Sequence, residues 1–271
     1  MRAVRTAVRR PIVDIVFHLA LPIQDMRITF LGTGSAMPTR DRHQTGILLE
    51  DRAADGPLLV DCGAGVLHNL AQTSVGYEGV DTVLLTHHHL DHTADLLPLL
   101  KARWLAGEEH LNVVGPEGTE ALLDSWLEAF DYLRGRMDLE VREVAAGEFG
   151  VAGFDVRAME TRHSVDCLAY RFDNRFVFSG DSEAFEELAE FAQGAAVFAH
   201  DCSFPDGVDV ENHPTPSALG KELSGTEIGR VYLTHLYPHT EGKEEEMVAA
   251  IGEHYEGEVR LASDMLSLSV E

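Results

Sequence analysis

Residues 86–92 constrain this chain more than any other segment, because they place four potential metal ligands directly after an apolar run. The segment reads Thr-His-His-His-Leu-Asp-His, and residues 83–85 before it are Val-Leu-Leu. A short apolar run of this kind predicts a buried strand. A buried strand end is a costly place for several polar rings that have nothing to bind. The four ligands are His87, His89, Asp91 and His92.

The spacing of these residues predicts their directions. If the extended conformation continued, His87, His89 and Asp91 would point to one side, because side chains of a strand alternate with a period of two. His88 would then point away from them and only pack. We expect the chain to turn into a helix after this segment.

The ligand types favour zinc. Neutral imidazoles and a carboxylate suit Zn²⁺, whereas Mg²⁺ and Ca²⁺ prefer mostly oxygen ligands. A solvated loop or a purification remnant is the alternative interpretation, but remnants lie at chain termini. Spacing, ligand type and strand context together predict a metal site here.

Polar residues also follow apolar runs elsewhere in the chain. His235 follows an apolar run and a threonine, as His87 does, and Asp61 and Asp181 follow two further runs. A sheet presents binding residues at the ends of its strands. Several such ends in one chain predict one shared site.

The pattern at 86–92 resembles that of the metallo-β-lactamase superfamily. Other segments resemble the ribonuclease Z-like branch of that superfamily, and the resemblance extends from Met26 nearly to the C-terminus. It implies an α/β fold, a four-layer αββα sandwich. The segments that carry the branch resemblance are 26–35, 59–63, 169–172, 200–204 and 233–236.

The resemblance implies a dinuclear centre with two Zn²⁺ ions, with Mn²⁺ as an alternative. A hydroxide bridging the metals would attack the substrate, and Asp91 would orient it as well as bind metal. The implied ligands are His87, His89 and His163 for one ion, Asp91, His92 and His235 for the other, and Asp181 as the bridge.

Three further residues receive supporting or catalytic roles. Asp61 is expected to accept a proton from a ligand imidazole and so fix its tautomer. His213 matches a position at which the branch carries a histidine that contacts phosphate or protonates the leaving oxygen; otherwise it orders a proline turn. His200 is expected to be structural or to support a ligand.

The sequence departs from the tRNA-processing members of the branch at one place. Those members carry a long tRNA-binding arm between the strand that ends here at Phe172 and the bridging aspartate. Here, Asp173-Asn174 predicts a tight hairpin turn instead. The arm is absent, which puts tRNA maturation in doubt, while RNA as such stays open. Small-molecule phosphodiesterases and sulfatases of the branch also lack the arm.

The formal net charge of −25, with only three lysines among 21 basic residues, predicts a protein adapted to concentrated salt, of haloarchaeal type. Such a surface argues against a general nucleic-acid-binding face. Local arginines remain candidates for receiving an anionic substrate: Arg40, Arg42, Arg162 and Arg171.

Composition and domain organisation favour a cytoplasmic enzyme. The three cysteines are an odd number beside expected strands, which indicates buried thiols in a reducing compartment. Residues 1–25 imitate a secretory leader, but their apolar stretch is interrupted and too short to span a bilayer. We therefore expect an extension of unclear status at 1–25, one hydrolase domain at 26–271, and no membrane partner. Homodimers are common in the branch.

The expected function is a dinuclear zinc-dependent hydrolase, a phosphodiesterase or ribonuclease Z-like enzyme. Hydrolysis of a small thioester, lactone or sulfate ester by the same metals is the alternative. A redox protein is a third hypothesis, but di-iron relatives usually carry glutamate where His89 stands.

The expected helices are 94–104, 118–130, 182–191, 216–223 and 244–254.

Overall fold

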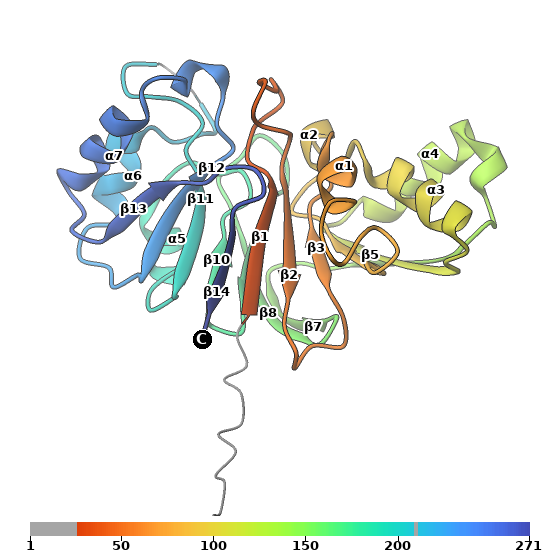
Figure 1. Ribbon diagram of the computed structural model, residues 1–271. Coiled ribbons are helices and arrows are strands. Elements are labelled where there is room, and N and C mark those ends of the chain that lie inside the picture. The colour runs from red at the N-terminus through yellow and green to blue at the C-terminus, as the bar shows by residue number, and fades with distance from the viewer. Residues whose placement is uncertain (1–25, 209–210) are drawn as a thin grey trace, which may run out of the picture.

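Two seven-stranded β-sheets lie face to face at the centre of the protein (Figure 1). The computed structural model describes residues 26–208 and 211–271, so the predicted extension at 1–25 lies outside the described residues. The first sheet consists of β1 (Met26–Gly32), β2 (Gly46–Glu50), β3 (Leu58–Val60), β4 (Thr82–Leu84), β5 (His110–Gly115), β6 (Asp138–Glu143) and β14 (Ser267–Val270). The second consists of β7 (Gly147–Val151), β8 (Phe154–Glu160), β9 (Leu168–Phe172), β10 (Phe176–Phe178), β11 (Val197–Asp201), β12 (Arg230–Thr234) and β13 (Glu258–Leu261).

Both sheets are mixed. The first has the strand order β14-β1-β2-β3-β4-β5-β6, antiparallel from β14 to β3 and parallel from β3 to β6. The second has the order β13-β12-β11-β10-β9-β8-β7, parallel from β13 to β10 and antiparallel from there to β7. Each sheet therefore has a parallel half, whose strands end at one common edge.

The inner faces of the sheets form one apolar core. Along β8, Phe154, Val156 and Ala158 are buried while Asp155 and Arg157 are exposed, the period of two that a half-buried strand requires. Strands β3, β4, β9, β10 and β11 are buried along their whole length, because helices cover their outer faces.

The helices occupy the two outer layers (Figure 1). Side chains of the first, third and fourth helices pack on the first sheet, and those of the fifth, sixth and seventh pack on the second. The predicted four-layer αββα sandwich is confirmed. The helices are α1 (Val66–Leu70), α2 (Leu90–Thr93), α3 (Leu96–Ala106), α4 (Thr119–Ala129), α5 (Glu186–Phe191), α6 (Pro216–Glu222) and α7 (Glu244–Gly252), with 3₁₀ turns η1 (Asp131–Leu133) and η2 (Pro238–Thr240).

Four of the five expected helices correspond to α3, α4, α6 and α7, with ends that differ by no more than two residues. The fifth expectation, 182–191, was wrong in its first turn, because α5 begins only at Glu186. The backbone N–H of Ser182 donates to Asp201, and that of Glu183 donates to the carbonyl of Arg162. These two N–H groups bind the end of β11 and the loop that carries Arg162, so they are not available for helical hydrogen bonds. The segment directly after Asp181 is therefore not helical.

The hairpin turn predicted between β9 and β10 is confirmed. Asp173 and Asn174 have φ values of 46° and 57°, and the N–H of Arg175 donates to the carbonyl of Phe172 at 2.9 Å. Positive φ at both central residues is the type I′ geometry, which matches the twist of the paired strands. No protruding arm lies between Leu168 and Asp181 in this part of the described chain.

The two sheets are joined close to the end of β4. The buried Tyr170 hydroxyl, on β9, donates to the carbonyl of Leu85 at 2.8 Å, and the N–H of Leu168 donates to the carbonyl of Thr86 at 3.0 Å. A backbone bridge between Gly34 and Leu236 links the sheets at the same edge. The loops that follow the strands of both sheets therefore face each other there.

The substitution Tyr170→Phe is expected to lower the free energy of unfolding by about 1–3 kcal/mol, because the buried Leu85 carbonyl loses its donor. Urea denaturation measures the change. The matched control is Tyr132→Phe, since Tyr132 is 47% exposed. Equal stabilities of the two variants would contradict a role for the inter-sheet bond.

Candidate metal centre

The segment after β4 turns into a short helix that carries two of the predicted ligands. β4 ends at Leu84, His89 is the N-cap of α2, and Asp91 and His92 lie inside α2. The expected extended conformation through Asp91 was therefore wrong. Both side chains nevertheless reach the cluster, because His92 Nε2 lies 3.2 Å from Asp181 and Asp91 Oδ2 lies 3.1 Å from His235.

One group of predicted ligands gathers around the carboxylate of Asp181. Ligand atoms of His87, His89, His163 and Asp181 all lie within 4.8 Å of one another. His163 Nε2 lies 3.2 Å from His89 Nδ1, and both His87 Nε2 and His163 Nε2 lie 3.7 Å from Asp181 Oδ2. These residues come from loops that follow strands of both sheets.

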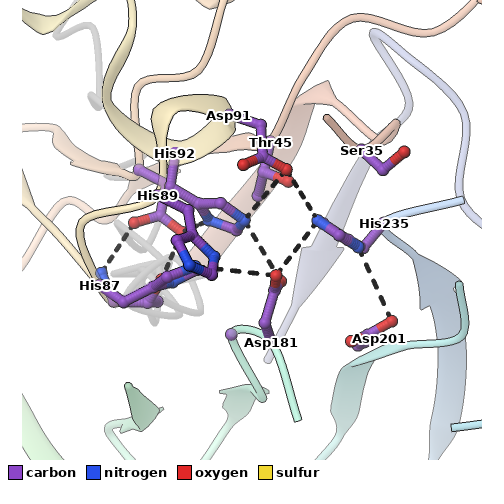
Figure 2. A network of polar contacts seen from close by, with 12 residues as sticks. Ser35, Thr45, His87, His89, Asp91, His92, Asp181, Asp201 and His235 are labelled. Carbon is purple, nitrogen blue, oxygen red and sulfur yellow. Dashed lines mark hydrogen bonds and ion pairs between the residues drawn. The ribbon is translucent and has the colours of Figure 1, made fainter. Parts of the chain in front are cut away.

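A second group, Asp91, His92 and His235, also lies beside the Asp181 carboxylate (Figure 2). His92 Nε2 is 3.2 Å from Asp181 Oδ1, and His235 Nε2 is 3.3 Å from Asp181 Oδ2 and 3.1 Å from Asp91 Oδ2. Asp181 thus contacts both groups, which is the arrangement that a bridging ligand requires.

Orphaned polar atoms test whether these residues fit cations. His87 Nε2, His92 Nε2 and Asp181 Oδ1 are buried and make no hydrogen bond, although the last two lie 3.2 Å apart as an ion pair. A buried polar atom without a partner destabilises the folded protein unless another group or an ion binds it. Imidazole and carboxylate donors are those that Zn²⁺ and Mn²⁺ accept, so the donor set fits two divalent cations.

Supporting contacts orient the imidazoles. Asp61 Oδ2 lies 2.7 Å from His92 Nδ1, and the Asp61 carboxylate also accepts hydrogen bonds from the N–H and hydroxyl of Thr86. The Thr86 hydroxyl lies 3.0 Å from His87 Nδ1. These contacts at Nδ1 leave Nε2 of both rings facing Asp181, as in metal sites whose ligands are fixed by outer partners.

Burial keeps one group of histidines neutral. It lowers the pKa of His87 well below the usual value, reinforced by the neighbouring His92, and it also lowers the pKa of His89 and His163. Neutral imidazole is the form that binds metal, so this group is ready to receive a cation.

The other group is held together by charge in the metal-free protein. Burial alone would lower the pKa of His92 and His235, but Asp181 and the other nearby carboxylates raise both. Burial alone would raise the pKa of Asp181, but the charges of His235 and His92 depress it well below the usual range. The carboxylates therefore favour positive charge on these two histidines, as they would favour a cation in the same place.

His213 lies beside the cluster, paired with an aspartate. Its Nδ1 is 2.7 Å from Asp201 Oδ2, and its ring stacks on that of His235 with centroids 5.3 Å apart. Burial alone would lower its pKa, but the charge and hydrogen bond of Asp201 raise the pKa of His213 to about 9. The ring is therefore cationic at neutral pH, with Nε2 left free of Asp201.

The remaining predicted histidines lie away from the ligand atoms. His200 Nδ1 donates to the carbonyl of Asp201 at 2.6 Å, and its ring packs on Phe198, so its described contacts reach none of the predicted ligands. His88 Nε2 lies 2.8 Å from the Thr119 hydroxyl, so His88 points away from the cluster as the sequence predicts.

Two residues of this network received no role from the sequence. Asp201 holds His213, and Ser203 Oγ donates to Asp201 and lies 2.9 Å from His235 Nδ1. The available signal was Asp201 itself, a carboxylate at the end of β11 that resembles Asp61 and Asp181 in position. The sequence instead indicated a supporting role for the adjacent His200.

The expectation for local arginines was wrong for Arg42 and Arg171. Arg42 Nη1 donates to the Thr33 hydroxyl and the Ala262 carbonyl. Arg171 Nη1 donates to the carbonyl at the end of α5 and to one that follows it. Both guanidinium groups therefore support loops. Arg162 pairs with Glu187 at 3.2 Å, and Arg40 is exposed.

A pocket of about 410 Å³ opens over the cluster. It is lined by Asp91, Asp181, His89, His163 and His213 among others, and none of its described lining residues is lysine or arginine. A further group, His110 with Asp138 and Glu140, lies on the surface at the edge of the first sheet. No buried orphaned atom supports a metal there among the described residues.

Comparison with known proteins identifies the family. The family model described as Anti-Pycsar protein Apyc1 matches residues 26–250. The chain belongs to that family. This Apyc1 family member is also 30% identical over 279 residues to a ribonuclease Z of Mycobacterium marinum, covering 90% of this chain and 99% of the relative.

Solved structures agree on the fold of this Apyc1 family member. It is similar to the metallo-β-lactamase fold protein YhfI from Bacillus subtilis, with a TM-score of 0.78, 25% identity, and coverage of 91% of this chain and 100% of that one. It is similar to the short form of human tRNase Z, with a TM-score of 0.72, 20% identity, and coverage of 90% and 99%. The metallo-β-lactamase fold is therefore shown.

Two smaller expectations can be compared with the structure. Cys62, Cys167 and Cys202 are buried free thiols, and Cys167 Sγ lies 3.6 Å from His87 Nδ1. Burial raises the pKa of all three thiols, so they remain protonated.

Within residues 26–208 and 211–271, no helix has both the length and the apolar content needed to cross a membrane.

The affinity of the metal-free protein for Zn²⁺ is expected to rise with pH, by about tenfold per pH unit for each proton displaced. The sign follows from the raised pKa of His92 and His235, whose protons must leave before a cation binds. Chelator competition at several pH values measures the affinity, and calorimetry in two buffers counts the protons.

The control is His110→Ala in the surface group, which should bind Zn²⁺ with the same pH dependence as the unaltered protein. An affinity that does not change with pH would show that these histidines do not bind the cation.

Proposed function

We propose that this protein is a dinuclear zinc-dependent hydrolase that cleaves phosphodiesters. The observation that carries the proposal is the pair of His/Asp groups that share the buried Asp181 carboxylate. Relatives named ribonuclease Z support the phosphodiester as substrate class. The proposed ligands are His87, His89 and His163 for one cation, Asp91, His92 and His235 for the other, and Asp181 for both.

Two divalent cations held there would supply an activated water at neutral pH and neutralise charge developing at phosphorus. Mn²⁺ would serve the same ligands. Among the residues of the chain, Asp91 borders the pocket. Burial alone would raise the pKa of Asp91, but the hydrogen bond from His235 and the charges of His92 and His235 together lower it. We assign Asp91 to orienting the attacking water, because an ionised carboxylate accepts its hydrogen bond.

We assign His213 to protonating the departing oxygen. Asp201 holds its Nδ1, the ring borders the pocket, and a cationic imidazole has a proton to give at Nε2. Ser203 connects Asp201 to His235, so the acid and one proposed ligand are held by the same carboxylate. Asp61 and Thr86 position His92 and His87 through their Nδ1 atoms. We give His200 a structural role.

The pocket favours a small substrate over a long polynucleotide. Two apolar residues, Ala36 and Leu90, lie in its lining, and Leu90 is 71% exposed. An apolar rim suits an uncharged group next to one phosphodiester. Strings of phosphates need clustered lysine or arginine, which the described lining does not offer. The two-residue turn at β9–β10 also leaves no tRNA-binding arm.

The same apolar rim favours the second candidate function, hydrolysis of a small thioester, lactone or sulfate ester. We further propose that the enzyme works in concentrated salt in a reducing, cytoplasmic compartment. Its net charge of −25 is screened by salt, and its thiols are buried and unpaired.

With Zn²⁺ or Mn²⁺ in concentrated salt, the enzyme is expected to hydrolyse bis(p-nitrophenyl) phosphate. The variants His89→Ala and Asp181→Ala should lose at least about 100-fold in kcat/KM, since each removes a proposed ligand. Release of p-nitrophenol measures the rate.

The matched control is His110→Ala, which should retain full activity. Unchanged turnover in Asp181→Ala would contradict the proposal. A panel of pre-tRNA, single-stranded RNA, cyclic nucleotides, aryl esters and thioesters, assayed at several salt concentrations, then distinguishes the substrate classes.

The substitution His213→Ala is expected to slow substrates with an alkyl leaving group by about 100-fold or more, and p-nitrophenyl substrates much less. An alkoxide needs a proton to depart, whereas p-nitrophenolate leaves without one. The ratio of the two rates measures the effect, and an equal loss on both substrates would exclude His213 as the acid.

A further inference from the structure

Three loops that reach the metal centre are bonded to one another through Glu183. The loops are 161–163, 181–183 and 211–213. The N–H of Glu183 donates to the carbonyl of Arg162 at 2.9 Å, next to His163. Glu183 Oε1 accepts the N–H of Asn212 at 3.1 Å. Glu183 thus joins the segment after Asp181 to the two loops that carry His163 and His213.

Asn212 has an unusual backbone conformation between these two histidines. Its φ is 68°, in the left-handed region that residues other than glycine rarely adopt, although asparagine tolerates it better than most. A conformation of this kind persists only where surrounding contacts enforce it, and it often marks a functional site. Here the enforcing contacts are the bond to Glu183 and a bond to His163.

The carbonyl of Asn212 orients a proposed metal ligand. It accepts a hydrogen bond from His163 Nδ1 at 3.2 Å. A ring whose Nδ1 carries the proton has its lone pair on Nε2, the atom that lies 3.7 Å from Asp181 Oδ2. The carbonyl therefore selects the tautomer in which His163 can bind a cation through Nε2.

The next residue, His213, faces a different partner. Its Nδ1 lies 2.7 Å from Asp201, and the following Pro214 restricts its backbone to extended conformations. The left-handed turn at Asn212 therefore directs a carbonyl towards His163 and the adjacent imidazole towards Asp201. A right-handed conformation at Asn212 would misplace at least one of the two.

We infer that Asn212 and Glu183 are positioning residues, which hold His163 as a metal ligand and His213 over the pocket at the same time. The inference rests on the proposed dinuclear function. It adds to that function a structural link between the proposed metal ligand His163 and the proposed acid His213. The backbone of Asn212 forms this link, and Glu183 holds it in place.

Two pairs of variants test this inference. Asn212→Val disfavours the positive φ, whereas Asn212→Gly adopts it freely and keeps both backbone bonds. Glu183→Ala removes the acceptor, whereas Glu183→Gln keeps an acceptor oxygen. The matched control is Asn174→Val, which places valine at a φ of 57° in the β9–β10 turn, outside the site.

The measurements are Zn²⁺ stoichiometry and affinity by chelator competition, thermal unfolding of the metal-free protein, and kcat and KM on an aryl phosphodiester. Asn212→Val and Glu183→Ala are expected to bind one of two Zn²⁺ ions about 10-fold more weakly, and to lose kcat more than they change KM. Asn212→Gly and Glu183→Gln should restore affinity to within about twofold. Asn174→Val should lower only the unfolding temperature.

Normal binding of both ions by Glu183→Ala and Asn212→Val, in a protein that binds two Zn²⁺ ions, would overturn this inference alone. So would an equal loss of Zn²⁺ affinity in Asn174→Val, because the effect would then be one of general stability. If Asn212→Val does not fold, the two Glu183 variants decide the matter. Absence of Zn²⁺ binding by the unaltered protein would overturn the proposed function and this inference together.

Discussion

The buried carboxylate of Asp181 is the constraint on which the rest of the site depends. Its oxygens lie 3.2 Å from Nε2 of His92, which follows a strand of the first sheet, and 3.3 Å from Nε2 of His235, which follows a strand of the second. A buried carboxylate is costly unless positive charge surrounds it. The protein meets this demand with histidines from both halves of the sandwich, and two of them, His87 and His92, leave Nε2 without a hydrogen bond. Bound cations would fulfil both needs at once.

The fold serves this site by bringing strand ends together. The parallel halves of both sheets end at the same edge, where a backbone bridge and the Tyr170 hydroxyl fasten one sheet to the other. Short loops leave little freedom for His87 and His235, and outer partners fix their rings through Nδ1. Rigid presentation of this kind is what a metal site of defined geometry requires.

Particular residues show how far sequence reasoning reached. The pattern of apolar runs followed by polar residues predicted which residues gather at the site. This was possible because each strand end can be recognised from a few consecutive residues. The backbone conformation at Asp91 was mispredicted, because helix α2 begins at Leu90, three residues after His87, where alternation assumed a strand. Arg42 and Arg171 were misjudged, because the carbonyls that bind them belong to distant segments.

The sequence by itself determined the kinds of donor, their attachment to strand ends, the two-residue turn at Asp173-Asn174 and the four-layer fold. These follow from local periodicity, turn chemistry and motif resemblance. Only the tertiary structure decided that Asp201 holds His213 and that a left-handed Asn212 joins His163 to Glu183. Each of these depends on which loops meet at the edge of the second sheet, and long-range contact of that kind leaves no periodic signal in a single chain.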